Sequence, residues 1–285
     1  MLSNAMNIRA TTPPVLREVL CKTVLNRSSL GDYSLNCYVG CAHGCAYCYA
    51  RYMQRFHPHE EAWGGFVDVK TNAPEALARQ VRRMPPGAVF VSSACDAWQP
   101  LEAQRQLTRE CCRILLDHGF AVHALTKSDL IRRDFDLFAD RDVQVATTIT
   151  TLDPAVARLW EVAASPVERR VDLLRAAREA GIQTGIMFGP LLPFLSDSTD
   201  NLNALFECAA ELRVDVLWVD ALNPRPKVWE SVQALLRTHY PDLVDRYARV
   251  LFSPVVRNAY LAALGERIAA AARRHRLERK LHSCI

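Results

Sequence analysis

Residues 167–188 read VERRVDLLRAAREAGIQTGIMF, and this stretch contains one complete connection from a helix to a strand. Apolar residues recur at three- and four-residue spacing through Val167–Ala180, which predicts an amphipathic helix. Gly181 follows, and a glycine just after the last helical residue is typical of a helix end. Gln183–Phe188 is then short and mostly apolar, so it predicts a strand. One such unit indicates a sheet that is covered by helices.

The same alternation extends in both directions along the chain. Further strand-like runs lie at Tyr33–Tyr38, Ala88–Ser93, Ala121–Thr126, Val143–Thr148 and Asp215–Asp220. Helical spacing separates several of them, at Pro74–Arg83, Leu101–Asp117 and Asn201–Arg213. Strands that alternate with helices are typical of βα units and a parallel sheet. The sequence therefore predicts an α/β fold, and ligands of such folds bind beyond the carboxyl ends of the strands, whether the sheet is open or closed.

The composition limits the class of protein. The chain has 285 residues, of which 50% are hydrophobic and 23% charged, and its formal net charge is +4. The hydrophobic and charged fractions exclude a mainly disordered or collagen-like chain. The net charge is smaller than that of a strongly basic nucleic-acid-binding protein. No apolar run reaches the ~20 residues of a membrane helix, and the N-terminus lacks a signal-peptide layout. We expect a cytoplasmic protein without membrane contact, whose residues 1–5 are a remnant of cloning.

Cysteine usage singles out one loop. The chain has ten cysteines, which in a reducing compartment are expected to be thiols or metal ligands. Three of them form a C-x3-C-x2-C pattern over Cys41–Cys48, directly after a predicted strand. Soft thiolates suit iron–sulfur sites, so each sulfur could bind one iron of a 4Fe-4S cluster and leave the fourth iron without a protein ligand. An open coordination position is what a catalytic metal requires.

A structural zinc site is the alternative for this loop. Cys37 precedes the three cysteines and would complete a set of four ligands. Zinc sites, however, usually divide their ligands into two separated pairs, and strand alternation aims Cys37 away from the loop. The sequence thus favours an iron–sulfur cluster on Cys41, Cys45 and Cys48 over zinc and over unliganded thiols.

The extended motif NCYVGCAHGCAYCYAR, residues 36–51, resembles the radical S-adenosylmethionine (radical SAM) signature in the branch related to spore photoproduct lyase, a DNA repair photolyase-like branch. The similarity spans roughly residues 25–200 and continues through Asp96–Glu102, Leu125–Ser128, Thr148–Asp153, Ser165–Arg169 and Gly181–Pro193. It implies a partial (β/α)6 TIM-like barrel over residues 25–222. An N-terminal segment, residues 1–24, would precede this barrel, and a helical extension, residues 223–285, would follow it.

The resemblance also implies the activity. A radical SAM enzyme of this kind reductively cleaves SAM at a 4Fe-4S cluster to a 5′-deoxyadenosyl radical, which abstracts hydrogen from a substrate in lyase- or oxidoreductase-type chemistry. It needs a reducing partner such as flavodoxin or ferredoxin. A nucleic acid is the leading candidate substrate, and a peptide or natural product is the alternative. The alternative from another functional class is a metal-bearing nucleic-acid-binding module without catalysis, which the basic run Arg273–Lys280 favours.

Residues at the strand ends are implied to bind SAM. Lys127 matches a lysine that contacts the SAM carboxylate, and an ammonium group suits that partner. Ser92 or Ser93 is expected at the methionyl amino group, and Thr147 or Thr148 at the ribose. The alternatives are an ordinary exposed lysine and hydroxyls that cap the backbone.

Tyr47 and Cys95 complete the candidate site. Tyr47 lies inside the cysteine motif, where the family tends to place an aromatic residue near adenine, and packing against the barrel is the alternative. Spore photoproduct lyase carries a hydrogen-donating cysteine near the end of the second strand, and Cys95 is displaced from that place by a few positions. Cys95 is therefore either a catalytic hydrogen donor or a small, partly buried thiol.

Overall fold

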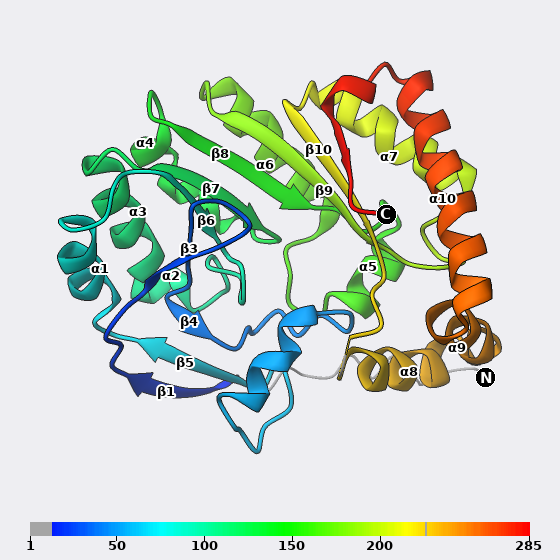
Figure 1. Ribbon diagram of the computed structural model, residues 1–285, viewed down its shortest axis with the longest axis horizontal. Coiled ribbons are helices and arrows are strands. Elements are labelled where there is room, and N and C mark those ends of the chain that lie inside the picture. Colours follow the sequence, from blue (N-terminus) through cyan, green and yellow to red (C-terminus); the bar gives the residue numbers. More distant parts are fainter. Residues whose placement is uncertain (1–12, 226) are drawn as a thin grey trace, which may run out of the picture.

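The computed structural model describes residues 13–225 and 227–285, and it contains two sheets (Figure 1). The larger sheet has eight strands in the order β11-β10-β9-β8-β7-β6-β3-β2. Six consecutive strands of this sheet pair with one another in parallel: β3 (Tyr33–Leu35), β6 (Ala88–Val91), β7 (Ala121–Thr126), β8 (Val143–Thr148), β9 (Gln183–Leu191) and β10 (Val216–Ala221). Each overlaps a predicted strand, so the predicted α/β class with a parallel sheet is confirmed. The predicted remnant of cloning, residues 1–5, lies outside the described residues.

Helices cover the outer face of this sheet (Figure 1). They are α1 (Ala73–Val81), α3 (Leu107–Asp117), α4 (Phe135–Phe138), α6 (Val167–Glu179) and α7 (Thr199–Leu212). Gly119 and Gly181, which follow α3 and α6, have φ values of 77° and 73°, in the left-handed region that glycine adopts at low cost. Apolar side chains of the strands and helices form the core between the two layers, where Leu77, Val91 and Leu115 are fully buried.

The predicted helix Leu101–Asp117 is two helices, α2 (Glu102–Arg105) and α3. Gln106 separates them with a φ of 52°. The buried carboxylate of Glu102 then accepts hydrogen bonds from the backbone N–H groups of Thr108, at 3.1 Å, and Arg109, at 3.2 Å. These N–H groups have no partner inside α3, so Glu102 caps the helix and favours the break.

The predicted strand Tyr33–Tyr38 is also divided, and its end belongs to another sheet. This smaller sheet has the order β1-β5-β4 and comprises β1 (Val15–Val19), β5 (Phe66–Lys70) and β4 (Tyr38–Val39). The chain leaves the large sheet after Leu35 and enters β4, which ends two residues before Cys41. The remaining short strand here, β2 (Leu25–Arg27), pairs antiparallel with β3. The cysteine motif therefore begins where the chain passes from one sheet to the other.

The C-terminal part is mainly helical, with α8 (Val228–His239), α9 (Val244–Phe252) and α10 (Pro254–Arg274). Its last residues form β11 (Leu281–Ser283), which adds a parallel strand beside β10. Further short helices are α5 (Pro154–Trp160), η1 (Tyr49–Arg55), η2 (Asp129–Asp134), η3 (Pro241–Leu243) and η4 (Glu278–Lys280). The boundary predicted after residue 222 stays a prediction. Within the described ranges, no helix has both the length and the apolar character that a membrane crossing needs.

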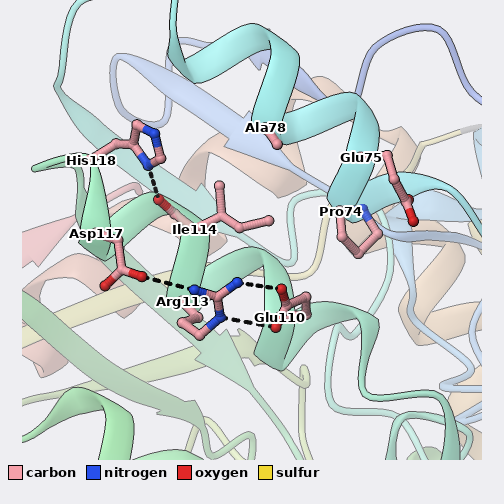
Figure 2. Close-up of a pocket in the computed structure, with 8 residues that line it drawn as sticks. All are labelled: Pro74, Glu75, Ala78, Glu110, Arg113, Ile114, Asp117 and His118. Carbon is pink, nitrogen blue, oxygen red and sulfur yellow. Dashed lines mark hydrogen bonds and ion pairs between the residues drawn. The ribbon is translucent and has the colours of Figure 1, made fainter.

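A surface groove of about 330 Å³ lies between α1 and α3 (Figure 2). Arg113 crosses it and forms ion pairs with Glu110 and Asp117, at 2.5 and 2.9 Å. Ala78 and Ile114 contribute apolar lining. None of the predicted site residues lines this groove, which lies on the helical layer rather than at the carboxyl ends of the strands.

Candidate functional site

The three predicted ligand cysteines share one compact loop, Cys41–Cys48, which we call the cysteine loop. Two backbone hydrogen bonds fold it tightly, from Gly44 N to Cys41 O at 3.2 Å and from Cys48 N to Cys45 O at 3.3 Å. Gly40, just before the loop, has a φ of 85°, and a Cβ there would lie 2.5 Å from the carbonyl oxygen of Phe66. Only glycine fits this approach, so local sequence shapes the entry to the loop.

Asp96 anchors the cysteine loop to the strand ends. Its carboxylate lies 3.3 Å from Nδ1 of His43 and accepts hydrogen bonds from Lys127 N at 2.8 Å and Thr126 Oγ1 at 2.7 Å. Burial opposes ionisation of Asp96, but the nearby His43 and these hydrogen bonds outweigh it and hold the pKa well below its usual range. Gln99 adds a second tether, because its Oε1 accepts from Ala42 N at 2.8 Å. Sequence reasoning did not assign this anchoring role.

Lys127 lies beside the cysteine loop, as a SAM-binding residue would require. Its Nζ is 5.7 Å from the ring centroid of Tyr47. Burial lowers the pKa of Lys127, but Cys45 and Glu161 outweigh that effect, and the pKa is raised. The ammonium group therefore stays charged next to the loop.

The side chain of Tyr47 is buried within the protein. Its ring stacks on Trp160 with centroids 6.4 Å apart, and its hydroxyl donates to Glu161. Glu161 also forms a buried ion pair with Arg170, which donates to the backbone carbonyl of Thr148 at 2.8 Å. This network ties the cysteine loop to the end of β8. No local pattern indicates this network, because Glu161 and Arg170 resemble ordinary charged residues on a helix surface.

The hydroxyl groups of both serines after β6 accept hydrogen bonds from neighbouring residues of the protein. Ser92 has a φ of 86°, and its Oγ accepts from Ala97 N at 3.0 Å, whereas Ser93 Oγ accepts from Asn36 Nδ2 at 2.7 Å. Cys95 is buried, and its Sγ lies 3.7 Å from Asn36 Oδ1. Burial raises the pKa of the Cys95 thiol, which therefore keeps its proton.

Thr147 and Thr148 are both buried at the end of β8. The Thr147 hydroxyl donates to the carbonyl oxygen of Thr126 at 2.8 Å. The backbone-capping alternative therefore describes Thr147, and Thr148 is the member of the pair whose carbonyl is held by Arg170. The ribose contact stays a prediction.

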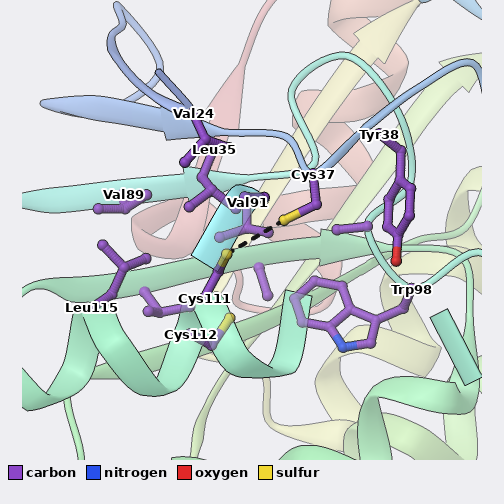
Figure 3. Packing of buried hydrophobic residues seen from close by; sticks show 14 of the residues in the cluster. Val24, Leu35, Cys37, Tyr38, Val89, Val91, Trp98, Cys111, Cys112 and Leu115 are labelled. Carbon is purple, nitrogen blue, oxygen red and sulfur yellow. Dashed lines mark hydrogen bonds between the residues drawn. The ribbon is translucent and has the colours of Figure 1, made fainter. Parts of the chain in front are cut away.

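Cys37 points away from the cysteine loop and into the core. Its Sγ is 3.6 Å from Sγ of Cys111, beside Cys112 (Figure 3). In the described part of the chain, no three His, Cys, Asp or Glu side chains converge on one metal ion. Because Cys37 faces the core, the structure does not bring it to the cysteine loop as a fourth ligand.

The surroundings of the loop suit an anionic, sulfur-rich group. Burial raises the pKa of Cys45 to about 12, and Lys127 is the largest opposing influence. Arg51 donates from Nη2 to the carbonyl oxygen of Cys45 at 3.0 Å, while its buried Nε has no partner among the described residues. The buried indole N–H of Trp63 likewise lacks a partner among the described residues. Burial raises the pKa of the Cys48 thiol, and Lys127 is again the largest opposing influence. Cationic groups and unused donors thus gather where a cluster would bind.

Known proteins resemble this chain in sequence and in fold. An uncharacterized protein of Mycobacterium tuberculosis is 32% identical over 279 residues, which cover 91% of this chain and 81% of that protein. An uncharacterized protein of Methanocaldococcus jannaschii is 34% identical over 166 residues, or 58% of this chain and 62% of that protein. The structure of spore photoproduct lyase complexed with dinucleoside spore photoproduct has a TM-score of 0.70 and 13% identity, over 94% of this chain and 81% of that one.

The structural likeness confirms the expected partial-barrel fold. The model of the radical SAM superfamily matches residues 35–203, which include the cysteine loop and the ends of β6 to β9. This match covers more than half of the chain. The chain is therefore a radical SAM enzyme and belongs to the radical SAM superfamily.

Proposed function

We propose that the chain binds one 4Fe-4S cluster through Cys41, Cys45 and Cys48 and cleaves SAM reductively. The observation that carries this proposal is the placement of the three thiols on one glycine-shaped loop, among the unused donors of Arg51 and Trp63. When bound, the cluster supplies the electron that splits SAM into methionine and a 5′-deoxyadenosyl radical. The protein provides binding, orientation and the surrounding charges.

Lys127 is the proposed partner of the SAM carboxylate. Its backbone N–H is fixed by Asp96, and its ammonium group lies near Cys45, Glu161 and the ring of Tyr47. A partly buried ammonium group at this position is suited to bind a further carboxylate through a charge-assisted hydrogen bond. The contacts of Ser92 or Ser93 with the amino group, of Thr147 or Thr148 with the ribose, and of Tyr47 with adenine remain proposals.

A nucleic acid is the proposed substrate class, because exposed aromatic and basic side chains adjoin the cysteine loop. Tyr49 and Tyr52 lie on η1 directly after the loop, and Phe56 is the residue that follows η1. Their side chains are 42%, 37% and 66% exposed, respectively. The guanidinium of Arg225, in the loop after β10, lies 5.7 Å from the ring centroid of Tyr49. Unpaired bases stack on exposed rings of this kind, and arginines bind the phosphates between them. A peptide or natural product is the alternative substrate.

Cys95 is the proposed hydrogen donor to the substrate. Burial keeps the thiol protonated, and a thiol can give up a hydrogen atom only in that state. Its neighbour Asn36 lies at the end of β3 and so connects the thiol to the strand ends. The reducing partner, flavodoxin or ferredoxin, is likewise a proposal that follows from the need of the family for an electron.

Anaerobic reconstitution with iron and sulfide tests the proposed function. We expect a 4Fe-4S electron paramagnetic resonance signal that changes when SAM is added, together with formation of 5′-deoxyadenosine. Cys37→Ala is the matched control, because Cys37 is a neighbouring cysteine that faces the core. Zinc in place of iron, or a cluster that does not respond to SAM, would refute the proposal and favour the non-catalytic binding module.

A further inference from the structure

Four aromatic side chains form a continuous row from the cysteine loop to the protein surface. The ring of Tyr47 stacks on Trp160, the last residue of α5, with centroids 6.4 Å apart. Trp160 in turn stacks on Tyr247 of α9, at 6.3 Å, and the ring of Phe194, in the loop after β9, lies 6.0 Å from Tyr247. Centroid distances of this size are typical of interacting aromatic pairs. We call these four residues the aromatic row.

The aromatic row is buried at the loop and open at its other end. Tyr47 is 6% exposed, and Trp160 and Tyr247 are fully buried, whereas Phe194 is 38% exposed. Phe194 also has a φ of 63°, in the left-handed region that a bulky residue adopts only at a cost in free energy. Strained residues of this kind gather at functional sites. The chain thus places an aromatic ring at the surface where glycine would fit the backbone more easily.

Basic and apolar side chains surround the exposed end of the row. The guanidinium of Arg246 lies over the ring of Phe194, 3.9 Å from its centroid. Arg249 and Phe252 follow at three-residue spacing along α9 and are exposed as well, so they lie on neighbouring positions of the helix surface. Residues 223–260 contain six arginines or lysines and three acidic residues. The surface at the end of the row therefore belongs to a part of the chain with an excess of positive charge.

We propose that the aromatic row carries an electron to the cluster from an acidic carrier protein that docks at Phe194 and Arg246. Cys41 and Cys45 are 6% and 5% exposed, so a donor of protein size cannot contact their thiols directly. The donor is oxidised by one electron and the cluster is reduced by one, while the rings keep their bonds and protons. Complementary charge speeds up and orients such docking. This inference rests on the proposed binding of a cluster by the cysteine loop.

The test of the path is anaerobic stopped-flow reduction of the reconstituted full chain by fully reduced flavodoxin, followed by the absorbance of the cluster. Tyr247→Leu interrupts the row and should lose most of the reduction rate at saturating flavodoxin. Tyr247→Phe is the matched control, because it keeps the ring and removes only a hydroxyl that has no hydrogen-bond partner among the described residues. Dithionite is small enough to reach the cluster by other routes, so it should reduce the wild type and both variants equally fast.

A separate measurement tests the docking surface. Oxidised flavodoxin transfers no electron, and its binding to the reconstituted chain is measured by fluorescence anisotropy. We expect Arg246→Glu to raise the Kd about tenfold at low ionic strength, because it repels an acidic partner, and to lose this effect as salt is added. Arg274→Glu, at the far end of the 21-residue helix α10, is the matched control and should leave the Kd unchanged.

A third variant separates the lost ring electrons from lost packing. Replacing Tyr247 with cyclohexylalanine keeps a six-membered ring without π electrons, and we expect the same loss of rate as in Tyr247→Leu. A flavodoxin-driven rate that survives this replacement, an equal loss with dithionite, or an unchanged Kd in Arg246→Glu would overturn the inference while the proposed function stands. If the wild-type chain bound no iron–sulfur cluster, the proposed function itself would fail, and the inference with it.

Discussion

Two groups of cysteines lie close together in this molecule and differ in what surrounds them. Cys37 contacts Cys111 in the core, among apolar side chains such as Leu35 and Val91 (Figure 3). Cys45 and Cys48, a few residues further along, lie beside Lys127. The hydrogen bond with Cys37 and burial both raise the pKa of Cys111, and burial raises the pKa of Cys45 and Cys48, so burial by itself does not distinguish the two groups. The neighbouring charges and unused donors do, because they stabilise an anionic sulfur only in the loop.

The largest expected effect comes from removing one thiol from each of the two groups and comparing the results. Cys45→Ala should abolish both cluster binding and SAM cleavage, because one iron then lacks its ligand. Cys111→Ala removes a core thiol instead and should cost about 1 kcal/mol of stability while SAM cleavage continues. Iron content, 5′-deoxyadenosine formation and denaturant unfolding of both variants check this. Equal loss of cluster in both would show that the two groups do not differ in function.

The anchor of the cysteine loop offers the next largest effect. Asp96→Asn leaves His43 without its buried carboxylate partner, and we expect the free energy of unfolding at pH 7 to fall by about 3 kcal/mol. Because the folded pKa of Asp96 is depressed, its contribution to stability is present above the ordinary pKa of about 3.9 and is lost as the pH falls below it. Urea unfolding between pH 7 and pH 3 measures both.

A matched variant controls for this anchor. Asp136→Asn removes an exposed carboxylate that pairs with Arg109, and it should change stability at pH 7 by less than about 1 kcal/mol. If Asp96→Asn showed the same acid dependence as the wild type, the proposed stabilisation by ionised Asp96 would be wrong. The electrostatic difference between the core cysteines and the loop cysteines would then depend on Lys127 alone.

The smallest expected effect concerns the surface beside the loop. Phe56→Ala and Arg225→Gln should each weaken binding of a labelled single-stranded oligonucleotide about tenfold in fluorescence anisotropy. The arginine variant should also lower the salt dependence by about one ion. Arg273→Gln, in the basic run of α10, is the control and should have little effect. Loss of binding in the control alone would move the nucleic-acid surface away from the site, and no binding by the wild type would favour a peptide or natural-product substrate.

Much of the fold follows from local patterns in the sequence. The six central strands and α6 were predicted within a few residues, because apolar periodicity and the glycines after helices are local signals. The short strands β1, β2, β5 and β11 were missed, and β4 was predicted only as the end of the strand Tyr33–Tyr38, since a strand of two to five residues depends on its partner strand for stability. The break at Gln106 was missed for a similar reason, as it is favoured by the side chain of Glu102.

The cysteine loop was identifiable because its spacing alone carries the chemistry: Cys41, Cys45 and Cys48 are contiguous in sequence. The roles of Asp96, Glu161 and Arg170 were not, since each contacts a residue that is distant in sequence. The sequence by itself therefore determined the α/β class and the candidate ligands, which depend on local periodicity and spacing. Only the tertiary structure decided which thiols meet positive charge and unused donors and which meet the core, because electrostatics depends on distances in space.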